Sequence, residues 1–136
     1  MRYLPPFDIV KQECLSPIVS GNIKSDAGKQ LISQESFVQA VRLLLRGVEV
    51  DEDWYVQAYP DIAEAIQAGA VKSAKIHFIE NGYFEGRLPF ELTVDEDWYL
   101  ATYPDVVEGI TRGDFRSAKD HFQNYGYKEG RQPAGL

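Results

Sequence analysis

Two histidines are the residues of this sequence most suited to chemistry. His77 and His121 are the only ones, and neither has a second histidine or a cysteine at ligand spacing on its own predicted helix. A metal site or an acid–base site would therefore depend on how distant parts of the chain pack. A core histidine that donates to a backbone carbonyl or a carboxylate is the more ordinary arrangement, and it is the one we expect here.

Neither the acidic clusters nor the cysteine predicts catalysis. The Asp-Glu-Asp runs that begin at Asp51 and Asp95 lack the alternating oxygen ligands and the central glycine of a calcium loop, so helix capping explains them better. Cys14 has no neighbouring histidine, and the chain contains neither a Gly-x-Ser-x-Gly turn nor a glycine-rich phosphate loop before a helix. We therefore expect no enzyme activity, no catalytic residue, no metal and no cofactor.

Aromatic side chains are the strongest candidates for a binding surface. Flat amphipathic rings can stack on sugars or anchor a protein partner if they are exposed, but tryptophan and tyrosine also build cores from few residues. We expect the tryptophans to lie in the core, and the tyrosines near the glycine turns, Tyr83, Tyr125 and Tyr127, to be partly exposed. The candidate binding residues are Trp54, Tyr55, Tyr59, Tyr83, Trp98, Tyr99, Tyr103 and Tyr127.

These residues recur because the chain contains a tandem repeat. Shifting the sequence by 44 residues aligns residues 50–89 with residues 94–133, and 23 of those 40 positions are identical. This identity is far beyond chance. The repeat is therefore the structural unit that must position the candidate residues.

Each repeat predicts three short helices. An aspartate caps the first helix, a proline ends it and opens the second, and a serine caps the third. A glycine ends the second helix, and another glycine closes the third in a left-handed conformation. In the order aspartate, proline, serine and the two glycines, these residues are Asp51, Pro60, Ser73, Gly69 and Gly82 in the first repeat, and Asp95, Pro104, Ser117, Gly113 and Gly126 in the second.

An arginine follows the glycine turn that ends each repeat. We expect Arg87 and Arg131 to make forked contacts with Asp61, Asp105 or the acids of the first helices, because a guanidinium group fits the geometry of a carboxylate. The alternative is an exposed anion site formed by the arginines. The excess of acids in the repeats favours the structural ion pairs.

A longer helix precedes the repeats. Ser33 can cap it, and Phe37, Val41, Leu44, Leu45 and Val48 recur at helical spacing, so they form the expected inward face. Leu43 lies off that face, which predicts burial from two sides. Either the helix is wedged between the repeats or it forms the seam of a homodimer.

The sequence as a whole predicts an all-α fold. An N-terminal arm (1–32) contains prolines and glycines without a sustained period, apart from a short helix near Phe7 to Glu13. A leading helix (33–49) and two three-helix repeats (50–93 and 94–136) follow, and residues 33–136 are expected to form a single folded domain.

Charge and composition exclude some partners. The formal net charge is −7, and the acids are concentrated in the repeats, so nucleic acids and anionic membrane surfaces are poor candidate partners. A lone cysteine fits a reducing compartment. Prolines and an acid interrupt the N-terminus where a secretory signal would be apolar, and no run is long enough to span a bilayer. We expect a cytoplasmic protein without membrane insertion.

The repeat resembles a known bacterial family. Its pattern is Trp-Tyr, then Tyr-Pro-Asp, then Ser-Ala-Lys-x-His-Phe, then Gly-Tyr-x-x-Gly-Arg-x-Pro over residues 50–133. Repeats of this type occur beside or fused to glycosyltransferases and exopolysaccharide-assembly proteins, although this chain contains no transferase domain. The resemblance implies a non-catalytic adaptor or regulator of surface-polysaccharide biosynthesis, with a glycosyltransferase or assembly component as partner. The alternative is a small glycan-binding protein that uses the repeated aromatics.

Overall fold

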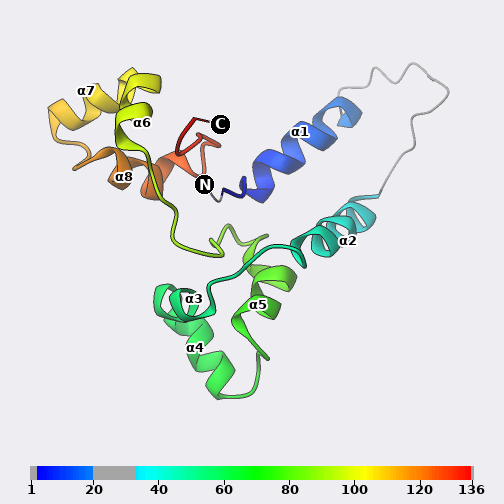
Figure 1. Ribbon diagram of the computed structural model, residues 1–136. Coiled ribbons are helices and arrows are strands. Elements are labelled where there is room, and N and C mark those ends of the chain that lie inside the picture. The colour runs from blue at the N-terminus through cyan, green and yellow to red at the C-terminus, as the bar shows by residue number, and fades with distance from the viewer. Residues whose placement is uncertain (1–2, 20–32, 136) are drawn as a thin grey trace. The chain divides into compact units, whose positions relative to one another are not determined.

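The computed structural model describes residues 3–19 and 33–135, and within these ranges all regular structure is helical and no strand occurs. The predicted all-α class is therefore confirmed. Two helices precede the repeats, and each repeat contains three α-helices, the third of which continues into a π-helical turn (Figure 1). The leading helices are α1 (Phe7–Val19) and α2 (Gln34–Leu45). Repeat 1 contains α3 (Glu52–Ala58), α4 (Pro60–Gln67), α5 (Ala74–His77) and η1 (Phe78–Gly82), and repeat 2 contains α6 (Glu96–Thr102), α7 (Pro104–Arg112), α8 (Ala118–His121) and η2 (Phe122–Gly126).

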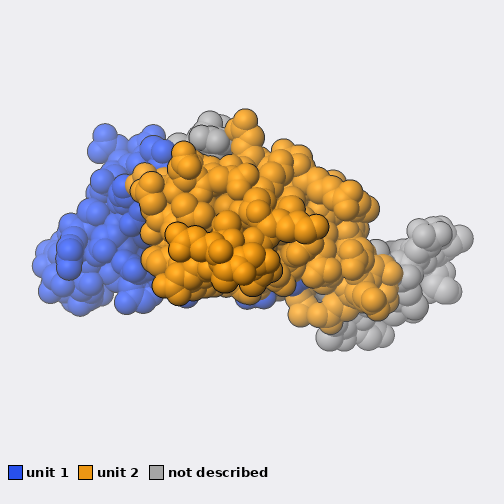
Figure 2. Space-filling view, turned by 90° about the horizontal axis from the view of Figure 1, so that it is seen from below, with its two compact units in different colours: residues 1–10, 92–136 blue, residues 11–91 orange. Residues whose placement is uncertain are grey.

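The chain divides into two compact units, coloured separately in Figure 2. One unit comprises Lys11–Glu91 and contains α2 and repeat 1. The other comprises Met1–Val10 and Leu92–Leu136 and contains repeat 2. The division after Glu91 lies close to the repeat boundary expected at 93/94. A single folded domain over residues 33–136 stays a prediction.

Local capping explains where the helices of each repeat begin. The Asp51 carboxylate accepts the Trp54 N–H at 3.0 Å, and the Ser73 hydroxyl accepts the Ile76 N–H at 3.2 Å, so each satisfies a donor that the helix itself leaves unpaired. Pro60 opens α4, where its missing N–H is not needed. The same roles belong to Asp95, Ser117 and Pro104 in repeat 2.

A π-helical turn ends each repeat's third helix, and here the sequence prediction was wrong. Gly82 and Gly126 were expected to be left-handed, but the glycines with positive φ are Gly69, Gly86, Gly113 and Gly130. In η1 the Tyr83 N–H donates to the Phe78 carbonyl at 2.9 Å, which is the wider π-helical spacing. Gly82 is instead required by space, because a Cβ atom there would overlap the Tyr55 hydroxyl, and Gly126 meets Tyr99 in the same way.

Each repeat closes on itself. The Asp51 N–H at the start of repeat 1 donates to the carbonyl of Pro89 at its end, at 2.9 Å, and Asp95 and Pro133 make the same contact in repeat 2. The buried core inside this closure is aromatic. Tyr55 and Phe78 are fully buried in repeat 1, as are their equivalents Tyr99 and Phe122 in repeat 2. Each repeat is therefore a small folded unit with its own core.

The first residues of the chain pack on repeat 2. Tyr3 lies edge-on to Tyr127, the Tyr127 hydroxyl donates to the Leu4 carbonyl at 3.1 Å, and Phe7 is buried. The predicted short helix near Phe7 to Glu13 runs further, to Val19. The remainder of the predicted arm, residues 20–32, lies outside the described residues.

Helix α2 packs on the π-helical turn of repeat 1. Ser33 caps it as expected, and Val41 and Leu45 are buried. The Arg42 guanidinium donates to the Glu80 carbonyl at 3.0 Å and lies 5.3 Å from the centre of the Phe84 ring. The expected inward face was wrong for Leu44, and so was the burial from two sides predicted from Leu43, because both side chains are exposed. Repeat 1 covers the side of α2 that carries Val41 and Leu45.

Candidate functional site

Each repeat contains a buried tyrosine–histidine pair. The Tyr55 hydroxyl lies 3.1 Å from Nδ1 of His77, and the Tyr99 hydroxyl lies 3.0 Å from Nδ1 of His121. All four side chains are buried. The histidines were expected to donate to a carbonyl or a carboxylate. The partner of Nδ1 in each histidine is instead a tyrosine hydroxyl, because the packing of the third helix on the first places these two side chains next to each other.

Burial keeps both members of each pair neutral. It lowers the pKa of His77 and His121 below the ordinary value of 6.5, and it raises the pKa of Tyr99 to about 12 and that of Tyr55 further still. A histidine that acts as a general base near neutral pH would instead have a raised pKa. Gly82 and Gly126 also fill the space beside the hydroxyls, so the geometry favours a structural pair.

The arginines make forked contacts with aspartates. Nη1 and Nη2 of Arg87 donate to the two carboxylate oxygens of Asp61 at 3.0 and 2.7 Å, and Nε donates to Glu85 at 2.8 Å. The hydrogen bonds from Arg87 lower the pKa of Asp61 and raise that of the arginine. The Arg87 guanidinium also lies 4.9 Å from the centre of the Tyr59 ring. Three of its five N–H groups and one of its flat faces are thus occupied within the repeat, which favours the structural ion pair over an external anion site.

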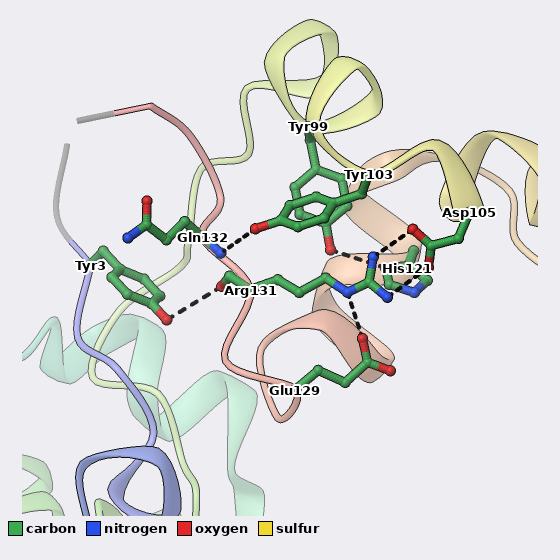
Figure 3. A network of polar contacts seen from close by, with 8 residues as sticks. All are labelled: Tyr3, Tyr99, Tyr103, Asp105, His121, Glu129, Arg131 and Gln132. Carbon is green, nitrogen blue, oxygen red and sulfur yellow. Dashed lines mark hydrogen bonds and ion pairs between the residues drawn. The ribbon is translucent and has the colours of Figure 1, made fainter. Parts of the chain in front are cut away.

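Repeat 2 contains the same network, shown in Figure 3. Arg131 reaches past the ring of Tyr103 to Asp105 and Glu129, with the same 3.0 and 2.7 Å fork. The Tyr103 hydroxyl accepts the Gln132 N–H at 3.1 Å. The contacts with Asp105 and Tyr103 join the closing turn of the repeat to its first two helices, and the contact with Glu129 lies within the turn.

The predicted aromatic surface is largely internal. Tyr55 and Tyr99 were candidate binding residues but are fully buried, and Tyr83 and Tyr127, expected to be partly exposed, are buried as well. Their rings build the core of these short helices, so they present no face to a ligand. The other four candidates are half-buried, with each tryptophan edge-on to a tyrosine: Trp54 to Tyr59, and Trp98 to Tyr103.

Tyr125 is the exposed tyrosine of the described repeats that the candidate list omitted. The residue is 53% exposed and its ring lies beside that of Phe115, which is nearly perpendicular to the imidazole of His121. In repeat 1, Val71 and Asn81 take the places of Phe115 and Tyr125. The absence of these two rings leaves room beside His77.

A groove of about 700 Å³ occupies that place in repeat 1. It lies between α2, the segment 70–72 and the α5–η1 helix, and His77 is part of its wall. Such a volume is typical of ligand pockets. Its cations are Arg42, Arg46 and Lys72, and its apolar side chains include Leu43 and Ile76.

Sequence reasoning missed this groove for a physical reason. Arg42 and Arg46 are one helical turn apart, and Lys72 occupies the position of Arg116 in repeat 2, so the basic residues were visible individually. Only the packing of α2 on η1 brings them together. Val71 and Asn81, which stand where repeat 2 has the aromatic Phe115 and Tyr125, are the sequence signal for a cavity.

Metal sites and membrane spans are also absent from the part of the chain that the structure describes. No group of three or more histidine, cysteine, aspartate or glutamate side chains is arranged to hold a metal ion. None of its helices has the length and apolar character needed to cross a bilayer. Glu52, one of the clustered acids, instead accepts the Ala74 N–H at 3.1 Å, and Glu96 accepts that of Ala118.

Comparison of the chain with models of known protein families, with curated proteins and with solved structures finds no match.

Proposed function

We propose that this protein is a non-catalytic interaction module that binds a protein partner through the outer face of α2. The observation that carries the proposal is the exposure of two adjacent leucines on that face, 60% for Leu43 and 77% for Leu44, with Ala40 one turn earlier. Large exposed apolar side chains grouped on one helix are typical of protein interfaces. Arg42 and Arg46 flank the leucines, so the complementary partner surface is apolar with an acidic border.

The chemistry of the buried networks supports a module without turnover. The tyrosine–histidine pairs are buried and neutral, and the arginine forks are satisfied by carboxylates within their own repeat. These groups stabilise the fold, and none of them is directed at an open cavity as an unpaired acid, base or nucleophile.

The biological setting is proposed from the resemblance of the repeat alone. It suggests an adaptor or regulator of bacterial surface-polysaccharide (exopolysaccharide) biosynthesis, and the lone cysteine is consistent with a location in the cytoplasm. The partner is then a glycosyltransferase or a polysaccharide-assembly component. The biological setting is inferred from the resemblance, and the binding surface is inferred from the exposed leucines.

Glycan binding is the second candidate function, and the exposure of Tyr125 favours it. Its ring lies next to Phe115, so the two form a small aromatic surface on which a sugar face could stack. Titration with an oligosaccharide of the native polymer separates the candidates. A glycan-binding protein gives saturable shifts of the Phe115 ring resonances that are lost in Tyr125→Ala, whereas a protein-binding module gives none.

The test of the proposed function compares variants during gentle purification from the native bacterium. Wild type is expected to retain a glycosyltransferase or assembly component in stoichiometric amount. Leu44→Asp should reduce that amount about tenfold or more, because a charge replaces an apolar anchor. The matched control is Val107→Asp, which changes an exposed apolar residue of repeat 2 and should retain the partner.

Two results would contradict the proposal. Equal recovery of the partner with Leu44→Asp and wild type would exclude α2 as the binding face. Recovery of the protein without any partner would exclude a stable complex. Light scattering gives a third readout. A mass of twice 15.4 kDa that returns to 15.4 kDa in Leu44→Asp would assign the face to a second copy of the chain.

A further inference from the structure

We propose that the groove between α2 and the α5–η1 helix of repeat 1 is a binding site for an organic phosphate. Arg42, Arg46 and Lys72 would hold the phosphate group, and Leu43 and Ile76 would contact the organic part. This inference goes beyond the proposed protein partner, because it concerns the cavity beside the leucine face. Leu43, Arg42 and Arg46 border both sites, whereas Lys72 and Ile76 belong to the groove.

The cations of the groove are unusual for this chain. The formal net charge is −7, and residues 50–93 contain three basic side chains against eight acidic ones. Even so, none of Arg42, Arg46 and Lys72 makes an ion pair with any residue that the structure describes. Only one carboxylate, that of Glu80, is part of the wall. The groove is therefore a local concentration of unneutralised positive charge on an acidic protein.

Arg42 is held in place for this role. Its Nη2 donates to the Glu80 carbonyl at 3.0 Å, and its guanidinium lies 5.3 Å from the centre of the Phe84 ring. Its Nε is buried and has no hydrogen-bond partner. A buried donor without a partner is disfavoured, and a positioned guanidinium loses little freedom when it binds an anion.

The apolar wall indicates a ligand that is larger than a free ion. The side chain of Leu43 is 60% exposed and that of Ile76 is 37% exposed, and both line the groove. The volume of about 700 Å³ also exceeds what a phosphate ion needs. An organic group attached to the phosphate would cover these side chains and remove their apolar surface from water.

Three cations favour a phosphate over a carboxylate. A phosphate monoester carries between one and two negative charges at neutral pH and has three strong acceptor oxygens, whereas a carboxylate carries one charge and has two. Two guanidinium forks and one ammonium group can share the three oxygens. His77 adds no charge at neutral pH, because burial lowers its pKa.

The experiment is a titration of the full chain, at 0.15 M salt, followed by ¹H–¹⁵N NMR at the amide groups around the groove and at Nε of Arg42. Phenyl phosphate is the probe that combines a phosphate with an apolar group. Inorganic phosphate tests the charge alone, and benzoate tests a carboxylate with the same apolar group. We expect saturable shifts with phenyl phosphate and affinity at least about tenfold weaker for the other two.

Matched variants identify the site. Arg46→Ala/Lys72→Ala removes two exposed cations and should weaken phenyl phosphate binding by about tenfold or more, with an otherwise unchanged spectrum. Arg116→Ala removes the counterpart of Lys72 in repeat 2 and should bind like wild type. Leu44→Asp, which disrupts the proposed protein-binding face, should also bind like wild type, so that failure of one proposal is distinguishable from failure of the other.

Three outcomes would overturn the phosphate site. Shifts that do not saturate would indicate only general attraction to positive charge. Equal affinity for Arg46→Ala/Lys72→Ala and wild type would place any binding elsewhere. Tighter binding of benzoate than of phenyl phosphate would assign the groove to carboxylates.

Discussion

The two buried tyrosine–histidine pairs show how a single residue can look functional in sequence and be structural in the fold. Among the residues that the structure describes, His77 and His121 are the buried side chains with an ordinary pKa near neutral pH, and each has a tyrosine hydroxyl as a hydrogen-bond partner. Burial lowers the pKa of each imidazole, since the charged form loses its hydration. The pairs therefore connect proton binding to stability.

At the residue scale we predict that stability falls as the solution is acidified below neutral pH. The unfolded chain binds a proton at each histidine with a pKa near 6.5, but the folded chain does so only at lower pH. The histidine contribution to stability is thus fully present above pH 6.5 and is lost as pH falls from 6.5 toward the lowered folded pKa. Urea denaturation between pH 7.5 and 5 measures it.

The control for this prediction is His77→Asn/His121→Asn, which keeps a polar atom near each tyrosine hydroxyl but cannot titrate. Its stability is lower throughout because the ring is lost, yet it should change less between pH 6.5 and 5. Parallel curves for the variant and wild type would contradict the assignment. Asp61 and Asp105 do not interfere in this range, because the pKa values of both are lowered below 3.8.

At the scale of the element, the π-helical turn positions the glycine that packs against the tyrosine–histidine pair. The wider spacing of η1 places Gly82 against the Tyr55 hydroxyl, and the closing turn then continues to Arg87. A regular α-helix through the same residues would direct different side chains inward. The turn therefore sets the register between the third helix and the arginine fork.

We predict that Gly82→Ala destabilises the protein by about 1–3 kcal/mol, because the added methyl group overlaps a buried and hydrogen-bonded hydroxyl. Urea denaturation at pH 7.5 gives the change. Gly47→Ala is the control, since its Cβ would lie at an ordinary 3.5 Å from the Leu44 carbonyl. Similar stabilities for the two variants would mean that Gly82 is not required by space.

At the scale of the whole molecule, the two repeats carry duplicate networks that share no residue. The Arg87 and Arg131 forks have the same distances, and so do the contacts that close the repeats at Pro89 and Pro133. The cores of the two repeats are thus alike, whereas their surfaces differ. Val71 replaces Phe115 at the groove, and among the described elements a preceding helix packs on the π-helical turn of repeat 1 but not on that of repeat 2.

We predict that Tyr55→Phe and Tyr99→Phe each destabilise the protein by about 1–3 kcal/mol, because each leaves Nδ1 of a buried histidine without its partner. The double variant should lose the sum of the two within about 0.5 kcal/mol, since sites without shared partners add. Denaturation of the four proteins measures this. A clear excess or deficit in the double variant would show that the two cores are energetically coupled.

Much of the helical framework was predictable from the sequence because its signals are local. Asp51 and Ser73 cap helices within three residues of their own positions, and Pro60 opens α4 by its fixed backbone angle. The fork between Arg87 and Asp61 also follows from residue chemistry, since a surplus of carboxylates surrounds few guanidinium groups. These features depend on neighbours in the chain or on charge, and both can be read without coordinates.

Only the tertiary structure decided which faces are buried. The burial of Tyr83, the exposure of Leu44 and the groove beside Arg42 depend on how α2 and the closing turns pack, and no local pattern encodes that packing. Apolar periodicity predicts that a helix has an inward face, but the size of the neighbouring element determines how much of that face is covered. The sequence by itself therefore determined the repeat, its helices and their caps, and long-range packing determined the surface that is left for binding.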